Sequence, residues 1–488
     1  MGSVKDFRPI FFVIGVLLTT VALAMLLPAV ADGIAGNPDW RVFLAAAMFT
    51  LFIGVAMALV NRTGEANLTV KQAFILTTFS WIIISAFAAL PFVFSDLGLS
   101  YGDAYFEAMS GLTTTGSTVI RGLDNAPPGI LLWRALLQWL GGIGIIVTAI
   151  AILPMLRIGG MQLFRAESSD QSERVLPRTA QLAGAIFLVY LALTVINALA
   201  YWLAGMTAFQ AICHGMTTIA TGGYSTSDRS FALFDNPAIE GIAIVFMILG
   251  SLPFVLYLQA VRGGAKRLWR DTQVRWFMGI VLVSLLALSG WLWLAGGMAI
   301  DDAVRYASFN AISILTGTGY SSANFGTWGS FALPAFTVLM FIGGCTGGTT
   351  GGIKVFRFQV LYATARVQIQ HLIQPHGVFP MKYNHRPIPE TVPGAVMGFF
   401  FLFVVTFAVL AMGLSLMGLD YITSISGAAT ALANVGPGLG PIIGPSGTFQ
   451  SMPEAAKWLL SFGMLLGRLE LFTVLILIVP AFWRDYGC

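Results

Sequence analysis

The sequence predicts an all-α polytopic membrane protein. Of its 488 residues, 57% are hydrophobic and only 10% are charged, and the mean hydropathy is +0.82. A soluble domain carries roughly a quarter charged residues, so this chain has too little polar material to cover a surface in water. The net charge of +4 does not indicate a nucleic-acid partner, because the basic residues lie in short loops between apolar runs.

About ten apolar stretches approach the length of about 20 residues that a membrane-spanning helix needs. They are expected near 9–29, 42–60, 73–94, 131–156, 182–203, 239–258, 277–294, 333–341 continued at 353–363, 394–417 and 456–480, so that one span is interrupted. Lys5 and Arg8 precede the first stretch, as in a secretory signal, but its apolar core is longer than the usual length of roughly 7–15 residues. We therefore expect a mature helix. Most lysines and arginines fall in alternate loops, which predicts that both termini are cytoplasmic.

Four short polar stretches, on the predicted outer side, separate pairs of spans. They lie at 101–118, 207–226, 301–322 and 420–440. Each has a polar start, about ten helix-compatible residues and a glycine- and threonine-rich end, and all four align on one glycine: Gly116, Gly223, Gly319 and Gly436. An internal repeat of about 100 residues predicts four re-entrant pore loops in pseudo-fourfold helix–pore loop–helix units around a central pore. The expected segments are two leading helices (1–66) and four pore repeats (67–180, 181–272, 273–388 and 389–488).

The aligned loops predict a cation filter. Irregular backbone at membrane depth is tolerated only where it lines a polar cavity, and a ring of carbonyl oxygens can replace the hydration shell of an alkali ion. The candidate K⁺ ligands, mainly backbone carbonyls, are Thr114, Thr115, Gly116, Thr221, Gly222, Gly223, Gly317, Thr318, Gly319, Asn434, Val435 and Gly436. The alternative is that these are turns whose small residues serve only close helix packing.

The loop motifs carry a family resemblance. They read TTTGS at 113–117, TGGYS at 221–225, TGTGYS at 316–321 and NVGPG at 434–438. With the two leading helices, they resemble the Trk-type bacterial potassium-uptake proteins, the TrkH/TrkG branch of the TrkH/KtrB superfamily. The resemblance implies K⁺ as the transported ion, a bacterial inner membrane, a homodimer and a TrkA-like cytosolic subunit that binds nucleotide. The loops differ from the TVGYG of tetrameric channels and from each other, which leaves strict discrimination against Na⁺ open.

The interrupted span predicts a gate. Between residues 343 and 354 lie six glycines: Gly343, Gly344, Gly347, Gly348, Gly351 and Gly352. By the resemblance, this segment is a gating loop beneath the filter; a packing kink is the alternative. Arg468 lies inside the last span, where a charge normally faces the interior or a water-filled path. We expect it to face the pore as an electrostatic barrier, with an interhelical ion pair as the alternative. Glu470, two residues on, does not share its helix face.

Other polar residues are expected to support the filter. Glu107, His214 and Asn310 each lie nine residues before an aligned glycine, and Gly427 holds that position in the fourth loop. Carboxylates near the expected starts of pore helices, at Asp103, Asp302 and Asp420, are expected to cap them. The basic stretches 262–275 and 354–386 either dock a cytosolic partner or are ordinary cytoplasmic loops.

The predicted function is K⁺ transport down its electrochemical gradient; the alternative is a symporter that couples K⁺ to Na⁺ or H⁺. An enzyme is not expected, because no catalytic motif is present. Cys213, Cys345 and Cys488 give no disulfide framework, and the four histidines show no zinc motif. We therefore expect no transition metal, no organic cofactor, and membrane lipid as the surroundings.

Overall fold

A computed structural model describes residues 7–62, 68–151, 175–264, 266–384, 386–389 and 391–484. Lys5, Cys488, both chain termini and the end of the span expected at 131–156 lie outside these residues. Nearly all of the regular structure is helical. The exception in the described chain is a two-residue hairpin, in which β1 (Lys382–Tyr383) pairs antiparallel with β2 (Arg386–Pro387).

The chain begins with a helical hairpin: α1 (Arg8–Ala24) and α2 (Leu26–Ala35) run into α3 (Trp40–Val60). Gly15 and Gly54 face each other where α1 crosses α3, and a Cβ added at Gly15 would lie 2.7 Å from Gly54 O. Small residues allow this close approach of membrane helices. The hairpin is joined to the rest of the molecule at Asp32, whose Oδ1 accepts a hydrogen bond of 2.6 Å from Gly129 N.

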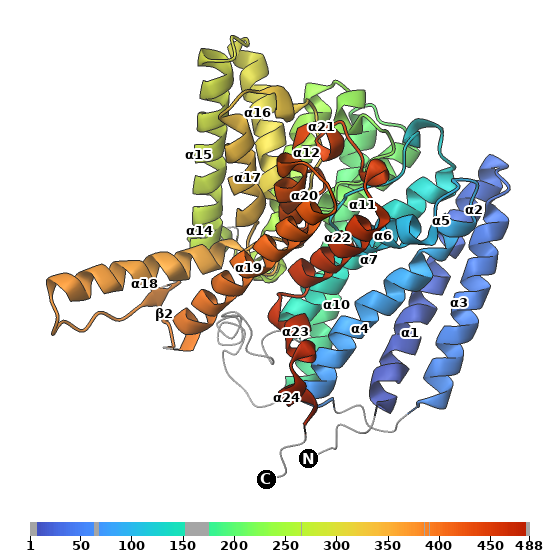
Figure 1. Ribbon diagram of the computed structural model, residues 1–488, viewed down its shortest axis with the longest axis horizontal. Coiled ribbons are helices and arrows are strands. Elements are labelled where there is room, and N and C mark those ends of the chain that lie inside the picture. Colours follow the sequence, from blue (N-terminus) through green and yellow to red (C-terminus); the bar gives the residue numbers. More distant parts are fainter. Residues whose placement is uncertain are drawn as a thin grey trace.

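The same order of elements then recurs four times: a long helix, a short helix, and a second apolar helix or helix pair (Figure 1). The first set is α4 (Val70–Ala88) with α5 (Leu90–Phe94), α6 (Tyr101–Leu112) and α7 (Pro128–Ala151). The second is α10 (Val175–Leu203), α11 (Ala208–Ile219), α12 (Pro237–Ser251) and α13 (Phe254–Gly263). After α14 (Lys266–Arg270), the third is α15 (Thr272–Leu294), α16 (Ile300–Leu315), α17 (Ala332–Ile342) and α18 (Val355–Ile373). The fourth is α19 (Thr391–Leu416), α20 (Tyr421–Ala433), α22 (Glu454–Arg468) and α23 (Phe472–Leu475), with the short helices α21 (Gly440–Ile443) and α24 (Pro480–Trp483).

Seven helices in the described chain are long and apolar enough to cross a membrane, and two bent helix pairs would make nine. The expectation of one interrupted span was too low. The run at 239–258 breaks between α12 and α13 with a bend of 94°, and the run at 456–480 breaks between α22 and α23 with a bend of 109°. The first break coincides with Pro253, which has no N–H to donate. At the second, Glu470 and Leu471 have positive φ of 64° and 51°.

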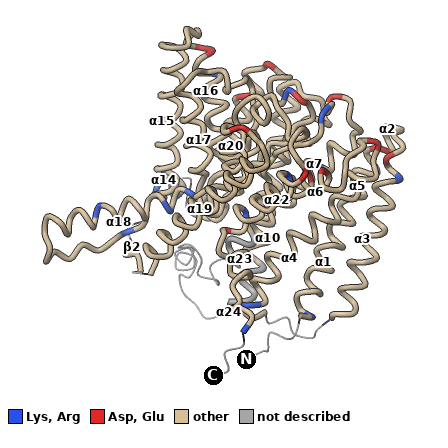
Figure 2. The backbone as a smooth tube through the Cα atoms, in the orientation of Figure 1, with Lys and Arg blue, Asp and Glu red and all other residues tan. Residues whose placement is uncertain are grey.

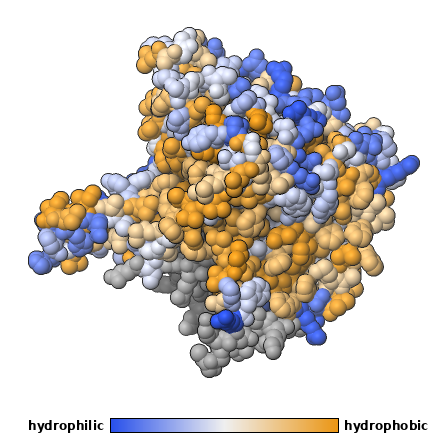
Figure 3. Space-filling model, in the orientation of Figure 1, coloured by the Kyte–Doolittle hydropathy of each residue, from blue (hydrophilic) through white to orange (hydrophobic). Residues whose placement is uncertain are grey.

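The surface matches a membrane environment. Large apolar side chains are exposed on the long helices, including Phe52, Leu188, Val283 and Phe401, each at least 65% exposed. Figure 3 shows a broad apolar band on one face of the molecule, below a more hydrophilic end. Figure 2 shows the acidic residues mainly towards the end that carries the loop between α15 and α16. The short helices α6, α11, α16 and α20 lie inside this shell and are largely buried.

Candidate ion pathway

The four short helices end in the same backbone conformation. The residue two before each aligned glycine has a positive φ: Thr114 (53°), Thr221 (49°), Gly317 (75°) and Asn434 (54°). Thr115 N donates to Ser110 O and Gly222 N to Thr217 O, both at 2.9 Å, as when a left-handed residue ends a helix and turns the chain. Positive φ is rare for threonine because its Cβ is branched. The two threonines are therefore strained positions of the kind that cluster at functional sites.

The four segments after these helices form a closed ring. Each aligned glycine lies against the backbone of another segment, as shown by the distance from an added Cβ to the nearest atom. A Cβ built on Gly116 would lie 2.1 Å from Gly222 O, and one built on Gly223 would lie 1.8 Å from Thr318 O. A Cβ on Gly319 would lie 2.7 Å from Gly436 N, and one on Gly436 would lie 3.2 Å from Gly116 O. The first segment thus meets the second, the second the third, the third the fourth, and the fourth the first. At the first three positions a side chain would collide with backbone.

Most carbonyls of the ring accept no hydrogen bond from the part of the chain that the structure describes. Of the twelve predicted ion ligands, only two have carbonyls that accept a bond from the described residues: Gly222 O from Gln138 Nε2 at 2.5 Å, and Gly436 O from Ser117 Oγ at 2.8 Å. More than about nine in ten buried backbone carbonyls are paired in proteins. A cluster of unpaired carbonyls in a nearly buried ring therefore fits a site for a cation, which oxygen atoms can coordinate.

Helix α7 holds the second segment in place. Gln138 is fully buried on α7, and its amide spans the second loop, because it donates to Gly222 O and its Oε1 accepts from Tyr224 N at 3.0 Å. Sequence reasoning missed Gln138. The signal was a lone amide in an apolar span, since polar side chains inside a membrane generally face the protein interior.

The polar residues nine before each glycine tie each short helix to the chain leaving its loop. Glu107 accepts from Val119 N at 2.9 Å, His214 Nε2 lies 3.1 Å from Ser225 Oγ, and Asn310 Nδ2 donates to Ser322 Oγ at 3.0 Å. Gly427 has no side chain to do this. Its neighbour Ser426 takes the role in the fourth loop, where its Oγ accepts from Leu439 N at 2.9 Å.

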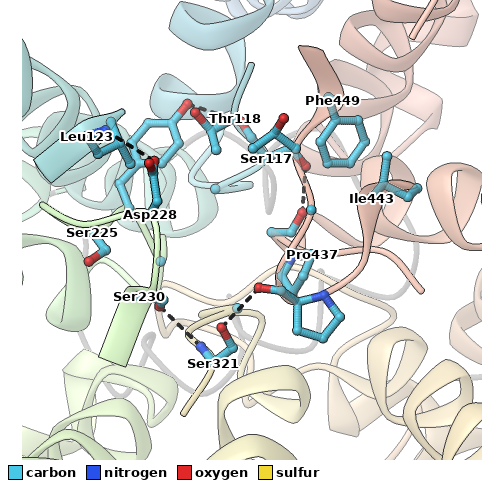
Figure 4. A pocket seen from close by; sticks show the side chains of 18 of the residues that line it. Ser117, Thr118, Leu123, Ser225, Asp228, Ser230, Ser321, Pro437, Ile443 and Phe449 are labelled. Atoms are coloured by element: carbon cyan, nitrogen blue, oxygen red, sulfur yellow. Dashed lines mark hydrogen bonds between the residues drawn. The ribbon is translucent and has the colours of Figure 1, made fainter. Parts of the chain in front are cut away.

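A cavity of about 70 Å³ lies on one side of the ring, and segments from all four quarters of the chain surround it (Figure 4). Its rim is fastened across segments: Ser321 N donates to Ser230 Oγ at 3.2 Å, and Ser321 Oγ donates to Pro445 O at 3.2 Å. Asp228 lines this cavity, and its carboxylate is occupied by hydrogen bonds from Gly122 N at 2.7 Å and Leu123 N at 3.1 Å.

The glycine-rich segment 343–354 is non-helical and packs against the other side of the ring. Thr349 Oγ1 lies 3.0 Å from Thr221 Oγ1, and a Cβ added at Gly351 would lie 2.3 Å from Ala433 O. The break between α12 and α13 receives the segment: Cys345 N donates to Ser251 O and Thr349 N to Gly250 O, both at 3.0 Å. The carbonyls freed where α12 ends thus regain partners, which is why this apolar run is not one straight span.

Two buried cations hold this segment. Arg468 Nη1 donates to Thr349 O at 3.0 Å, and Lys354 Nζ donates to Thr350 O at 2.5 Å. The Nε and Nη2 atoms of Arg468 have no hydrogen-bond partner among the described residues, and Arg468 forms no ion pair with an acid in this part of the chain. The cavity between the segment and Arg468 is only about 10 Å³, roughly the space of one water molecule.

The basic stretch 354–386 was interpreted as surface, and its first two cations are not. Lys354 is 7% exposed, and Arg357 is fully buried in an ion pair with Glu470.

The prediction that three carboxylates cap the short helices is correct only for Asp420, which accepts from Thr423 N at 3.1 Å. Asp103 is the third residue of α6, where Ser100 is the cap, and it pairs with Lys457 at 2.5 Å. Asp302 lies in the first turn of α16, which begins after Ala299 without a side-chain cap.

Within the described residues, no group of three or more His, Cys, Asp or Glu side chains is arranged to hold a metal ion. Cys213 and Cys345 are buried and free. The oxygen atoms gathered at the ring are backbone carbonyls and threonine hydroxyls, which suit an alkali cation rather than a transition metal.

Comparison with known proteins gives consistent matches over the whole chain. The family model TrkH, described as cation transport protein, matches residues 40–484. The Trk system potassium uptake protein TrkI of Halomonas elongata is 44% identical over 484 residues, which cover 99% of this chain and 98% of that protein. The Trk system potassium uptake protein TrkH of Escherichia coli K12 is 37% identical over 98% of this chain and 100% of that protein. The crystal structure of the potassium transporter TrkH from Vibrio parahaemolyticus superposes with a TM-score of 0.92 at 37% identity, and covers 98% of this chain and 100% of that one.

Proposed function

Because the chain belongs to the TrkH family of cation transport proteins, we propose that it is a K⁺-uptake protein with a channel-like pathway. The single observation that carries the proposal is the closed ring of four loops, whose carbonyls largely lack hydrogen-bond partners among the described residues. Stripping water from K⁺ is costly, and the ring offers oxygen atoms in its place. The short helices end at the ring, so their negative C-terminal ends favour a cation there.

In this proposal the filter consists of the residue two before each aligned glycine, the next residue and the glycine itself. Gly222 and Gly436 are the weakest ligands, because their carbonyls already accept bonds from Gln138 and Ser117. The four quarters therefore offer unequal oxygen atoms. A less uniform ring discriminates less strictly between K⁺ and Na⁺ than one built from four identical subunits.

The glycine-rich segment 343–354 acts as the gate. Its contacts with Thr221 and Ala433 place it directly against the ring, and the remaining space of about 10 Å³ is too small for a hydrated ion. Arg468 adds a positive charge where a cation would pass, which raises the electrostatic barrier. The gate opens when the segment moves away from Arg468 and Lys354.

Coupling to Na⁺ or H⁺ is not favoured. Coupled transporters usually place an ionisable acid beside the substrate site. Glu470, the acid expected near the centre of a span, is engaged by the guanidinium of Arg357. We infer passive transport through the ring.

The proposal extends to the assembly. The five-part division into a leading hairpin and four pore repeats follows the recurring order of elements. The family supports a homodimer in the lipid of a bacterial inner membrane, with cytoplasmic termini and a TrkA-like, nucleotide-binding cytosolic subunit. Exposed cations on α14, including Lys266 and Arg267, are available for such a partner.

Ion flux into liposomes that contain the purified protein tests the proposal. We expect K⁺ and Rb⁺ to enter faster than Na⁺ and Li⁺, with no requirement for a Na⁺ or proton gradient. Equal flux of all four ions would remove the selective filter from the proposal. A K⁺ flux that stops when the Na⁺ or proton gradient is collapsed would establish the symporter instead.

A further inference from the structure

A third cavity, outside the ring, lies beside helix α18. It has a volume of about 480 Å³ and lies between the start of α15, one side of α18 and the segment 379–384 that folds back along that helix. Figure 1 shows α18 leaving the helical bundle roughly crosswise to α15. Its lining combines aromatic and basic side chains, including Trp276, Tyr362, Arg366 and Lys382. No step of the proposed ion pathway uses these residues.

The cavity lies at the level where a membrane meets water. Thr272, in its wall, is the first residue of an apolar span that ends at Leu294. Trp269 and Trp276 lie close to Thr272 in sequence, and Tyr362 lines the same cavity; these side chains are 58%, 39% and 58% exposed. Exposed tryptophan and tyrosine are typical of the headgroup layer on either side of a bilayer. The exposed cations of α14, just before this span, identify the layer as the cytoplasmic one.

Two cations of the cavity are available for an anion. Arg366 and Lys382 make no ion pair within the described chain. Asp271 is an acid beside the cavity, and its oxygen atoms accept hydrogen bonds from Gln273 N at 2.8 Å, Val274 N at 3.3 Å and Asn384 Nδ2 at 3.3 Å. Basic pockets between membrane helices on the cytoplasmic side are typical sites for acidic lipid headgroups.

Two further polar atoms restrict the kind of headgroup. Gln359 is 93% buried in the cavity wall, and although its Nε2 donates to Thr272 O at 2.9 Å, its Oε1 has no partner in the described chain. The hydroxyl of Thr272 also lacks one. Buried polar atoms are rarely left unpaired, so a ligand that brings hydroxyl groups would complete them.

We propose that this cavity binds the headgroup of phosphatidylglycerol. The phosphate lies between Arg366 and Lys382, and the glycerol hydroxyls bond to Gln359 Oε1 and Thr272 Oγ1. The acyl chains run along the exposed apolar face of α15, at Leu282, Val283 and Leu286. The ammonium of phosphatidylethanolamine would meet two like charges, and choline offers no hydroxyl or N–H donor to Gln359.

The test is native mass spectrometry of the full-length protein, reconstituted in equal mixtures of phosphatidylglycerol and phosphatidylethanolamine and then released into detergent. We expect the wild-type protein to retain phosphatidylglycerol. The double variant Arg366→Gln with Lys382→Gln should lower that retention by roughly tenfold or more, because each cation near a membrane surface contributes about 1 kcal/mol to the binding of an acidic lipid. The matched control, Lys266→Gln with Arg267→Gln, removes the same charge outside the cavity and should leave retention unchanged. Gel filtration and K⁺ flux verify that each variant is folded.

A second arm tests the hydroxyl contacts. Gln359→Leu should lower retention of phosphatidylglycerol while leaving phosphatidic acid, which has the phosphate but no headgroup glycerol, at its wild-type level. Equal losses in the two charge-removing double variants would overturn the site, because retention would then reflect general basicity. Protection against thermal unfolding by soluble glycerol phosphate, equal to that by the lipid, would overturn the lipid assignment in favour of a free phosphate compound.

Discussion

Glu107 and Arg134 form a fully buried ion pair, with 2.8 Å between Oε1 and Nε and side chains that are 0% and 1% exposed. The pair joins α6 to α7, and Arg134 also donates to Ser225 O at 2.9 Å and lies 4.0 Å from the ring centroid of Tyr224. It therefore connects the first and second loops.

Removing one partner of this buried ion pair should lower the free energy of unfolding far more than breaking an exposed ion pair. Glu107→Gln leaves Arg134 as an uncompensated buried charge, and we expect a loss of about 3–5 kcal/mol in the free energy of unfolding. The control is Asp235→Asn, which breaks a pair with Arg305 in which Asp235 is 75% exposed, and which should cost about 1 kcal/mol or less. Thermal unfolding in detergent measures both. Similar shifts in the two variants would contradict the structural role of Glu107.

The ring contact of Gly223 can be tested by a single methyl group. A Cβ at Gly223 would lie 1.8 Å from Thr318 O, at a φ of 82° that side chains rarely adopt. We expect Gly223→Ala to lower K⁺ flux at least about tenfold, since the second and third segments must separate. Gly279→Ala, on the open surface of α15 with no atom within 4 Å, should leave the flux unchanged. Normal flux in the Gly223 variant would argue against a tightly packed ring.

Arg468 should act as a barrier. Arg468→Ala removes both the positive charge and the bond to Thr349 O, so K⁺ flux should rise by roughly tenfold, given a barrier of about 1–2 kcal/mol. Arg468→Lys keeps the charge and should lie close to wild type. Arg270→Ala, exposed on α14, is the control. Flux measured in liposomes at equal protein content decides, and an unchanged or lower flux in the alanine variant would refute the barrier.

Lys354 should restrain the same segment at the carbonyl next to the one that Arg468 holds. Its φ of 72° is a strained conformation, so Lys354→Gly removes the bond to Thr350 O without forcing the backbone to change. We expect higher K⁺ flux, and a double variant with Arg468→Ala whose flux is below the product of the two single effects, because both cations hold one element. Lys354→Arg serves as the control that retains a cation. A double-variant flux equal to the product of the two single-variant effects would mean that Lys354 and Arg468 act independently.

Asp32 should anchor the leading hairpin. Its carboxylate accepts from Gly129 N in the first turn of α7, where a negative charge also complements the helix dipole. Asp32→Ala should lower the free energy of unfolding by about 1–2 kcal/mol. Gly129→Ala should do the same from the other side, because a Cβ there would lie 2.2 Å from Asp32 Oδ2. Asp302→Ala, which removes an exposed carboxylate that caps no helix, should leave the melting temperature nearly unchanged.

The sequence carried enough to locate the loops and the glycine-rich segment, but not the partners of the buried cations beside that segment. One alignment on glycine located Thr114, Thr221, Gly317 and Asn434, which share a left-handed conformation, because the turn that ends each short helix is a local property. The partners of Lys354 and Arg357 depend on contacts that no local pattern encodes: Arg357 meets Glu470 from more than a hundred residues away. Charge placement alone therefore assigned these two cations to the surface.

The extra helix breaks were missed for a related reason. Hydropathy shows how long an apolar segment is, but not whether its helix bends. The apolar segments around Leu252 and Leu471 were therefore predicted as straight helices. Pro253 was a local signal for the first break. The second, at Glu470 and Leu471, has neither proline nor glycine, and its positive φ values are adopted where Glu470 reaches Arg357.

The four loops of the ring are unlike one another and belong to a single gene product. A point mutation therefore alters one wall of the passage and leaves three as they were, whereas in a tetramer of identical subunits the same mutation would strike every wall at once. In the proposed filter, ion preference can therefore change through one of four unequal sets of oxygen ligands at a time.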